Sequence, residues 1–182
     1  MAYTFDDHKI GLLQISQTDS GVTSPSGVST GSTTVIPTPP AVLGQIERAF
    51  DPTYGAGEFI LLLGVASTTI GSLVTYDGTT YQTTLAAVTS NQARPVAVAM
   101  AATTAGLYGW YQIAGTAVVS KSTSSNFAAT VALGVKSTGK VGATSSGKEI
   151  LGARTANAAT VASATATVTV VLNRPHLQGR VT

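Results

Sequence analysis

The chain has 182 residues, a formal net charge of +2 and no cysteine. This length fits one domain with an appendage, and the lack of cysteine excludes disulfides, thiolate nucleophiles and cysteine-bound metals. Charged residues make up only 10% of the chain, against about 25% in an average soluble domain. A surface with so few charges is poorly protected against association, so the composition indicates a protein that works in an assembly.

The N-terminal part differs in composition from the rest. Residues 1–19 include Ile10, Leu12, Leu13 and Ile15, which can dock on another surface. Residues 20–40, SGVTSPSGVSTGSTTVIPTPP, are mostly Ser, Thr, Gly and Pro and have no periodic apolar face. We therefore predict an extended N-terminal arm or linker over residues 1–43 and a β-rich domain over residues 44–182. No basic segment followed by an apolar one marks a signal peptide.

The body has the pattern of an all-β fold, with short apolar or alternating segments between glycine-rich turns. EFILLLGVAS is typical of a strand buried on both faces, and LVTYDGTTYQ predicts strands over 73–76 and 79–82 around a two-residue turn at Asp77 and Gly78. Further strands are expected over 95–101, 108–119, 130–136, 150–155 and 166–172. Residues 157–164 are the best helix candidate. The expected architecture is a compact β-sandwich or barrel-like body.

The segment AGLYGWYQIAGTAVV holds the only tryptophan and lies in a run without charge from Pro95 to Ser120. The run is rich in small residues and hydroxyls, so we expect no membrane span. In a strand, Tyr108 and Trp110 point to one face and Tyr111 to the other. Such a pair can form a sugar or base platform, but packing in a core or interface is favoured. Two further aromatic residues, Tyr54 and Phe59, are candidates for the same core or interface.

Catalytic and nucleic-acid-binding patterns are missing from the sequence. The eight carboxylates and two histidines form no pattern of an acid–base pair, a triad or a metal site. The ten lysines and arginines are scattered, and no glycine-rich loop has the lysine of a phosphate cradle. We therefore predict no enzyme activity and no catalytic residue, cofactor or metal. We also expect no nucleic-acid, membrane or small-molecule partner.

Four segments resemble the capsid decoration (cement) proteins of tailed bacteriophages. They are RAFDPTYGAGEFILLLGVAST at 48–68, GSLVTYDGTTYQTTL at 71–85, RPVAVAMAATTAGLYGWYQIAGTAVV at 94–119 and VVLNRPHLQG at 170–179. The resemblance spans about residues 44–180. It lies in the residue composition and order of these segments rather than in a catalytic motif.

The resemblance implies a β-rich body, a homotrimer, that binds the major capsid protein on the outer surface of the virion. Such a protein is made in the host cytoplasm and stabilises the shell by bridging capsid subunits, often through an N-terminal arm. The alternative function is a head fibre or adhesin-type module that binds a host surface glycan, for which an exposed face of Tyr108 and Trp110 would be needed.

Overall fold

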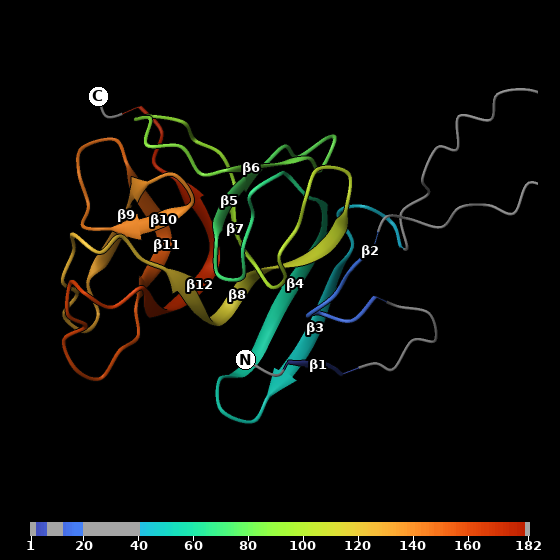
Figure 1. Cartoon of the computed structure of the whole chain (residues 1–182), viewed down its shortest axis with the longest axis horizontal. Helices are drawn as coiled ribbons and strands as arrows, with labels where there is room; N and C mark the ends of the chain where they lie inside the picture. The colour runs from blue at the N-terminus through green and yellow to red at the C-terminus, as the bar shows by residue number, and fades with distance from the viewer. Residues whose placement is uncertain (1–2, 7–12, 20–40, 181–182) are drawn as a thin grey trace, which may run out of the picture.

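A computed structural model of the chain describes residues 3–6, 13–19 and 41–180 (Figure 1). These residues form twelve β-strands and no helix, which confirms the predicted all-β fold. The strands are β1 (Thr4–Phe5), β2 (Thr18–Asp19), β3 (Ile46–Asp51), β4 (Gly55–Leu63), β5 (Leu73–Tyr76), β6 (Thr83–Leu85), β7 (Val96–Ala99), β8 (Tyr108–Ser120), β9 (Ala132–Ser137), β10 (Lys140–Gly142), β11 (Glu149–Thr155) and β12 (Thr167–Leu177).

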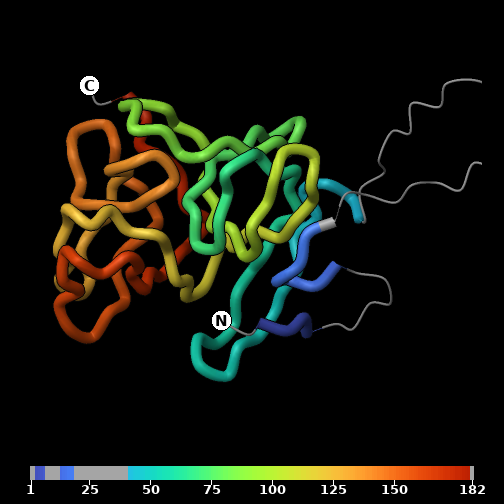
Figure 2. The backbone as a smooth tube through the Cα atoms, in the orientation of Figure 1, coloured from blue at the N-terminus to red at the C-terminus, as the bar shows by residue number. Residues whose placement is uncertain are grey.

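The strands form an antiparallel sheet in the order β1-β3-β4-β8-β12-β11-β9-β10, and β6, β5 and β7 join it through β8. Two bridges close this sheet into rings. Leu63 beside Gln82 completes a first ring of β4, β8, β7, β5 and β6, and Lys121 beside Val141 completes a second ring of β8, β12, β11, β9 and β10. β8, drawn in yellow, belongs to both rings and connects the two lobes that the rings form (Figures 1 and 2).

Apolar side chains fill three separate clusters around β8. The first ring encloses Ile60, Leu62, Val74, Ala97, Ala99, Tyr111 and Ile113. The second ring encloses a larger cluster that includes Ala117, Val119, Leu133, Val135, Val141, Ile150, Val168, Val170 and Leu172, and the outer face of β5 and β7 packs on it through Leu73, Val96 and Val98. The third cluster lies against β3, β4 and β8 and consists of Tyr3, Phe5, Leu13, Ile15, Ala49, Phe59, Leu61, Met100, Tyr108 and Trp110.

The third cluster is covered by residues 3–6 and 13–19, which we call the N-terminal clasp. β1 pairs with β3, and β2 pairs with the first residues of β8. The clasp is part of the predicted N-terminal arm, and its described residues pack on the body of the same chain. The rest of that arm up to residue 40, with Ile10 and Leu12, lies outside the described residues.

The predicted two-residue turn at Asp77 and Gly78 is wrong. Oδ1 of Asp77 accepts hydrogen bonds from the backbone N–H groups of Thr79 and Thr80, both at 2.8 Å, so the side chain organises a longer loop. The chain pairs again with β5 only from Thr83, where β6 begins.

The predicted helix over residues 157–164 is also wrong. Phe127 and Val161 form a β-bridge, and the side-chain amide of Asn157 donates to the carbonyl oxygen of Phe127. Asparagine side chains that bond to the backbone compete with helix formation. The segment is therefore a loop that connects β11 and β12. It is bonded to Phe127, which lies in the loop before β9.

A candidate docking surface

The aromatic residues singled out in the sequence lie in the cores. Trp110 has 1% of its surface exposed, Tyr111 and Phe59 have none, Tyr108 is buried and Tyr54 is half-buried. The two faces of β8 point into different clusters, with Tyr108 and Trp110 in the third and Tyr111 in the first ring. Both faces are therefore covered by other parts of this chain.

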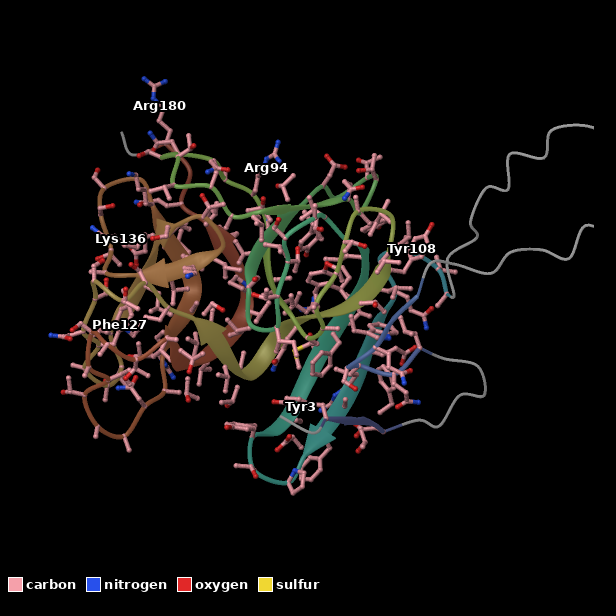
Figure 3. The ribbon with its side chains drawn as sticks, viewed as in Figure 1. Tyr3, Arg94, Tyr108, Phe127, Lys136 and Arg180 are labelled. Atoms are coloured by element: carbon pink, nitrogen blue, oxygen red, sulfur yellow. The ribbon has the colours of Figure 1, made fainter. Side chains whose placement is uncertain are left out.

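Trp110 is enclosed by the N-terminal clasp. Its indole N–H donates to the carbonyl oxygen of Leu13 at 2.7 Å, and Phe5 meets its ring edge-on with centroids 5.1 Å apart. Tyr3 makes the same kind of contact with Phe59 at 4.9 Å. Figure 3 shows Tyr3 and Tyr108 on the lobe that carries β1 and β2. The ring of Trp110 leaves no free face on which a sugar or base can stack.

The buried polar side chains of this region bind to other groups of the same fold, except that Oε1 of Gln112 has no hydrogen-bond partner. The hydroxyl groups of Tyr111 and Thr103 share a hydrogen bond of 3.1 Å, and burial raises the pKa of the Tyr111 phenol. Gln112 is fully buried and donates its side-chain amide to the carbonyl oxygens of Ala114 and Thr116. These contacts fix the path of β8 and do not converge on a cavity.

Titratable groups do not gather into a reactive cluster in the described parts of the chain. No group of three or more histidine, aspartate or glutamate side chains within them is arranged to hold a metal ion. His176 pairs through its backbone with Pro95, and His8 lies outside the described residues. Asp77 is exposed in its loop, where the N–H groups of Thr80 and Thr79 lower the pKa of its carboxyl.

The strand registers define a continuous, partly exposed surface on one face of β3, β4, β8, β12 and β11, which we call the open face. Arg48, Glu58, Ala114 and Asn173 are successive partners in the sheet, so their side chains form one row across four strands. A second row runs from Thr116 on β8 to Val171 and Arg154. A third consists of Phe50 and Ala56.

Large apolar side chains are exposed at the β3 end of the open face. Ile46 and Phe50 are 44% and 52% exposed and flank Arg48 on one side of the strand, and Val42 precedes them at 75%. Three of the six exposed large apolar residues of the described chain thus lie within nine positions. A cluster of this kind marks an interaction surface more often than single exposed residues do.

Two hollows lie in the open face. One has a volume of about 390 Å³ and is lined by Gly152, Ala153, Arg154, Val171 and Asn173. The other has a volume of about 180 Å³ and is lined by Arg48, Ala56, Gly57, Glu58, Ala114 and Gly115. Their floors consist of small side chains and their rims carry arginines, so the face is shaped to receive protruding side chains of another protein.

Two of the five arginines of the chain, Arg48 and Arg154, belong to the rows of the open face, and a third, Arg174, reaches Glu58 of the first row. Nε and Nη2 of Arg174 bind one carboxylate oxygen of Glu58 at 3.1 and 3.0 Å, which ties β12 to β4 across β8. Arginine and aromatic residues are enriched at protein interfaces, whereas lysine is depleted. None of the residues that form the rows is a lysine.

The sequence did not reveal this surface because its residues are far apart along the chain. The signal was the alternation in IERAFD, where Ile46, Arg48 and Phe50 point outward and Ala49 and Asp51 are buried. A search for apolar runs does not find this strand, because it contains charged residues. The arginines on β11 and β12 come together with β3 only through the register of five strands.

Comparisons with models of known protein families, with curated proteins and with solved structures found no match. In the parts of the chain that the structure describes, there is no helix with the length and apolar character needed to cross a membrane.

Proposed function

We propose that this chain is a structural virion protein that binds the outer surface of a phage capsid as a homotrimer. It stabilises the shell by bridging neighbouring major capsid protein subunits, without a catalytic step. The resemblance of its sequence to capsid decoration proteins gives the class. The open face is the observation that carries the proposal, because it offers a broad association surface without a convergent polar site.

The composition of the open face supports a role in assembly. It combines arginines and exposed apolar side chains with shallow hollows, as protein interfaces do. The chain as a whole has few charges to oppose association. Several modest contacts made together by linked copies give an attachment much stronger than any one of them. A clamp of this kind raises the free energy needed to separate capsid subunits under the pressure of packaged DNA.

The burial of Tyr108 and Trp110 bears on the alternative function. A glycan-binding module needs an aromatic face open to solvent, and the faces of these two residues are covered. We therefore propose no second function.

The proposal is tested with expanded, undecorated shells of the phage that encodes the chain. The purified protein should bind them saturably and at fixed stoichiometry in a co-sedimentation assay, and should raise the temperature at which the shells disrupt in calorimetry. Phe50→Ser should weaken binding by about tenfold or more, because burial of an aromatic side chain at an interface contributes more than 1.4 kcal/mol.

Val88→Ser is the matched control, since Val88 is an exposed apolar residue at 37% on the loop between β6 and β7 and should leave binding unchanged. Failure of the unaltered protein to bind expanded shells would refute the proposed function. Equal binding by Phe50→Ser and the unaltered protein would show that the open face is not the association surface.

A further inference from the structure

The charges of the chain are divided unequally between its two lobes. Residues 116–182 contain seven of the ten lysines and arginines, but only one of the eight carboxylates, Glu149. These residues form the end of β8 and the strands β9 to β12, which build the second ring. The lobe around the second ring is therefore the positively charged end of the molecule.

Two of these seven cations already have partners inside the fold. Nζ of Lys121 is buried on three backbone carbonyl oxygens, and Arg174 binds Glu58. The other five form no ion pair with any described residue, and they are Lys136, Lys140, Lys148, Arg154 and Arg180. Of these five, Arg154 is the one that belongs to the rows of the open face.

The neighbours of Arg154 on the surrounding strands carry no charge. Arg154 lies opposite Val171 on β12 and Ala132 on β9, and Thr116 of β8 continues the row beyond Val171. Its side chain is exposed at the hollow of about 390 Å³, which we call the Arg154 hollow. The positive charge at this position is therefore open to a partner.

The other arginine in the rows has an acidic neighbour. Arg48 and Asp6 line one hollow at the β3 end, and the backbone N–H of Asp6 donates to the carbonyl oxygen of Arg48 at 3.2 Å. Together with the pair of Arg174 and Glu58, this places carboxylates beside both arginines outside the Arg154 hollow. Among the described residues, the unbalanced charge of the open face is thus at Arg154.

The Arg154 hollow lies at an irregular pairing of β11 and β12. Between the pairs Leu151–His176 and Ala153–Leu172, the single residue Gly152 of β11 faces three residues of β12. Gly152 has φ +78° and has no side chain to occupy the space. The volume of about 390 Å³ compares with roughly 30 Å³ for a water molecule in the liquid. The hollow therefore has room for a side chain of another protein.

We infer that the Arg154 hollow binds an aspartate or glutamate side chain on the surface of the major capsid protein. The guanidinium of an arginine presents a planar fork of N–H groups that matches the two oxygens of a carboxylate. Asn173 lines the same hollow and offers a side-chain amide as a further donor, while Ala153 and Val171 contact the apolar stem. The positive lobe attracts an acidic surface during the approach.

A nucleic acid fits this site less well than a carboxylate does. Binding to nucleic acid depends on several cations that neutralise successive phosphates. The Arg154 hollow contains one cation, and two of its lining residues, Ala153 and Val171, are apolar. A single acidic side chain with a short apolar stem matches both properties.

This inference rests on the proposed function, because it names the chemical group of the capsid protein that the open face binds. The two fail in different experiments. If the unaltered protein does not bind expanded shells, the proposed function is refuted and the inference falls with it. If the unaltered protein binds and Arg154→Gln binds equally well, the inference alone is overturned.

The test is co-sedimentation of the full-length protein with expanded, undecorated shells over a series of salt concentrations. Arg154→Gln should raise the dissociation constant by about tenfold or more, because it leaves the carboxylate of the partner without its counter-charge. Salt should weaken the binding of the unaltered protein more than that of Arg154→Gln, since the variant has lost a charge that salt screens. An equal salt dependence of the two proteins would contradict an ionic contact at this position.

Arg180→Gln is the matched control for net charge. It removes the same charge from the same lobe, but Arg180 lies beyond the end of β12 near the C-terminus (Figure 3) and should leave shell binding close to that of the unaltered protein. Thermal unfolding should be alike for both variants, since Arg154 and Arg180 are exposed. Equal weakening by Arg154→Gln and Arg180→Gln would assign the effect to the charge of the whole lobe and overturn the inference.

A cross-linking experiment identifies the group that Arg154 meets. Arg154→Lys places an amine in the hollow, and a carbodiimide should couple this amine to an aspartate or glutamate of the capsid protein on decorated shells. Mass spectrometry of the digested shells should then find a capsid peptide joined at position 154. Decorated shells that yield cross-links at other lysines of the chain and none at position 154 would overturn the inference.

Discussion

Lys121 is a buried lysine whose three N–H bonds all end on backbone carbonyl oxygens. It has 1% of its surface exposed, and Nζ donates to the carbonyl oxygens of Ser122, Ser125 and Ser163 at 3.1, 2.7 and 3.0 Å. Burial lowers the pKa of this ammonium, and the three carbonyl dipoles act in the opposite sense by stabilising its charge. The side chain thus joins the end of β8 to two loops, in the way that a bound cation would.

Replacing Lys121 by methionine should lower the free energy of unfolding by about 2–4 kcal/mol. The substitution keeps the apolar stem and removes the donor from three carbonyl oxygens in a site with almost no access for water. Urea unfolding of Lys121→Met measures the change. Lys140→Met, at an exposed position on β10, should change stability by no more than about 0.5 kcal/mol. Equal stability of both variants would mean that the three contacts contribute nothing.

At the scale of the element, β8 serves two rings because it changes direction in its middle. Its register with β4 shifts opposite Glu58 and Phe59, and Gly115 adopts φ +91° just beyond this point. A Cβ at Gly115 would lie 2.4 Å from the carbonyl oxygen of Ala56, which is backbone and cannot move aside. The first half of the strand packs in the first ring and the third cluster, and the second half packs in the second ring.

Gly115→Ala should lower the free energy of unfolding by about 2–4 kcal/mol, since it adds both a left-handed backbone cost and a clash with β4. Calorimetry or urea unfolding measures the loss. Gly78→Ala should be close to neutral, because a Cβ at Gly78 would have no neighbour within 4 Å and its φ is ordinary. A stable Gly115→Ala protein would refute the claim that this position requires glycine.

The positions of many strands along the chain were predictable from local sequence. The expected strands over 95–101, 108–119, 130–136 and 150–155 match β7, β8, β9 and β11 to within a few residues, because apolar runs and glycine turns bound them. The strands that were not predicted are short or carry charged residues, as β10, β3 and the clasp strands do. Their pairing depends on partners distant in the chain rather than on their own residues.

The site was predictable only in part. The aromatic content of β8 identified residues that matter for packing. However, Leu13, whose carbonyl oxygen accepts the hydrogen bond from Trp110, lies 97 positions earlier in the chain. The open face depends on the register of five strands, and no local pattern in the sequence contains that register. The side chains of Asp77 and Asn157 also form hydrogen bonds with the backbone. The chain therefore forms loops at these two places instead of the predicted turn and helix.

For the whole molecule, buried tyrosines set the response to alkaline pH. Burial raises the pKa of Tyr3, Tyr76 and Tyr111 above the ordinary value of 10.0. Above pH 10 the unfolded chain releases these protons while the folded protein keeps them. Their contribution to stability is therefore complete below pH 10 and is lost as the pH rises through the folded-state pKa values. Burial lowers the pKa of Lys121 from its usual 10.5, so this lysine contributes to the pH dependence of stability with the opposite sign. A comparison of variants separates the effect of the tyrosines from that of Lys121.

Tyr111→Phe isolates the alkaline effect of one phenol. At pH 8 the variant should be less stable by about 1 kcal/mol, because it loses the hydrogen bond with Thr103. At pH 11 this difference should shrink or reverse, because the variant has no buried phenol that resists ionisation. Urea unfolding at the two pH values measures the difference, and a constant difference would contradict the assignment.

The covering of Trp110 by the N-terminal clasp has a spectroscopic consequence. The chain contains a single tryptophan, so its fluorescence comes from one indole that donates to Leu13 and touches Phe5. Release of the clasp brings water to that ring and shifts its emission to longer wavelength. The unlabelled protein therefore carries a built-in optical reporter of whether residues 3–6 and 13–19 are packed on the body.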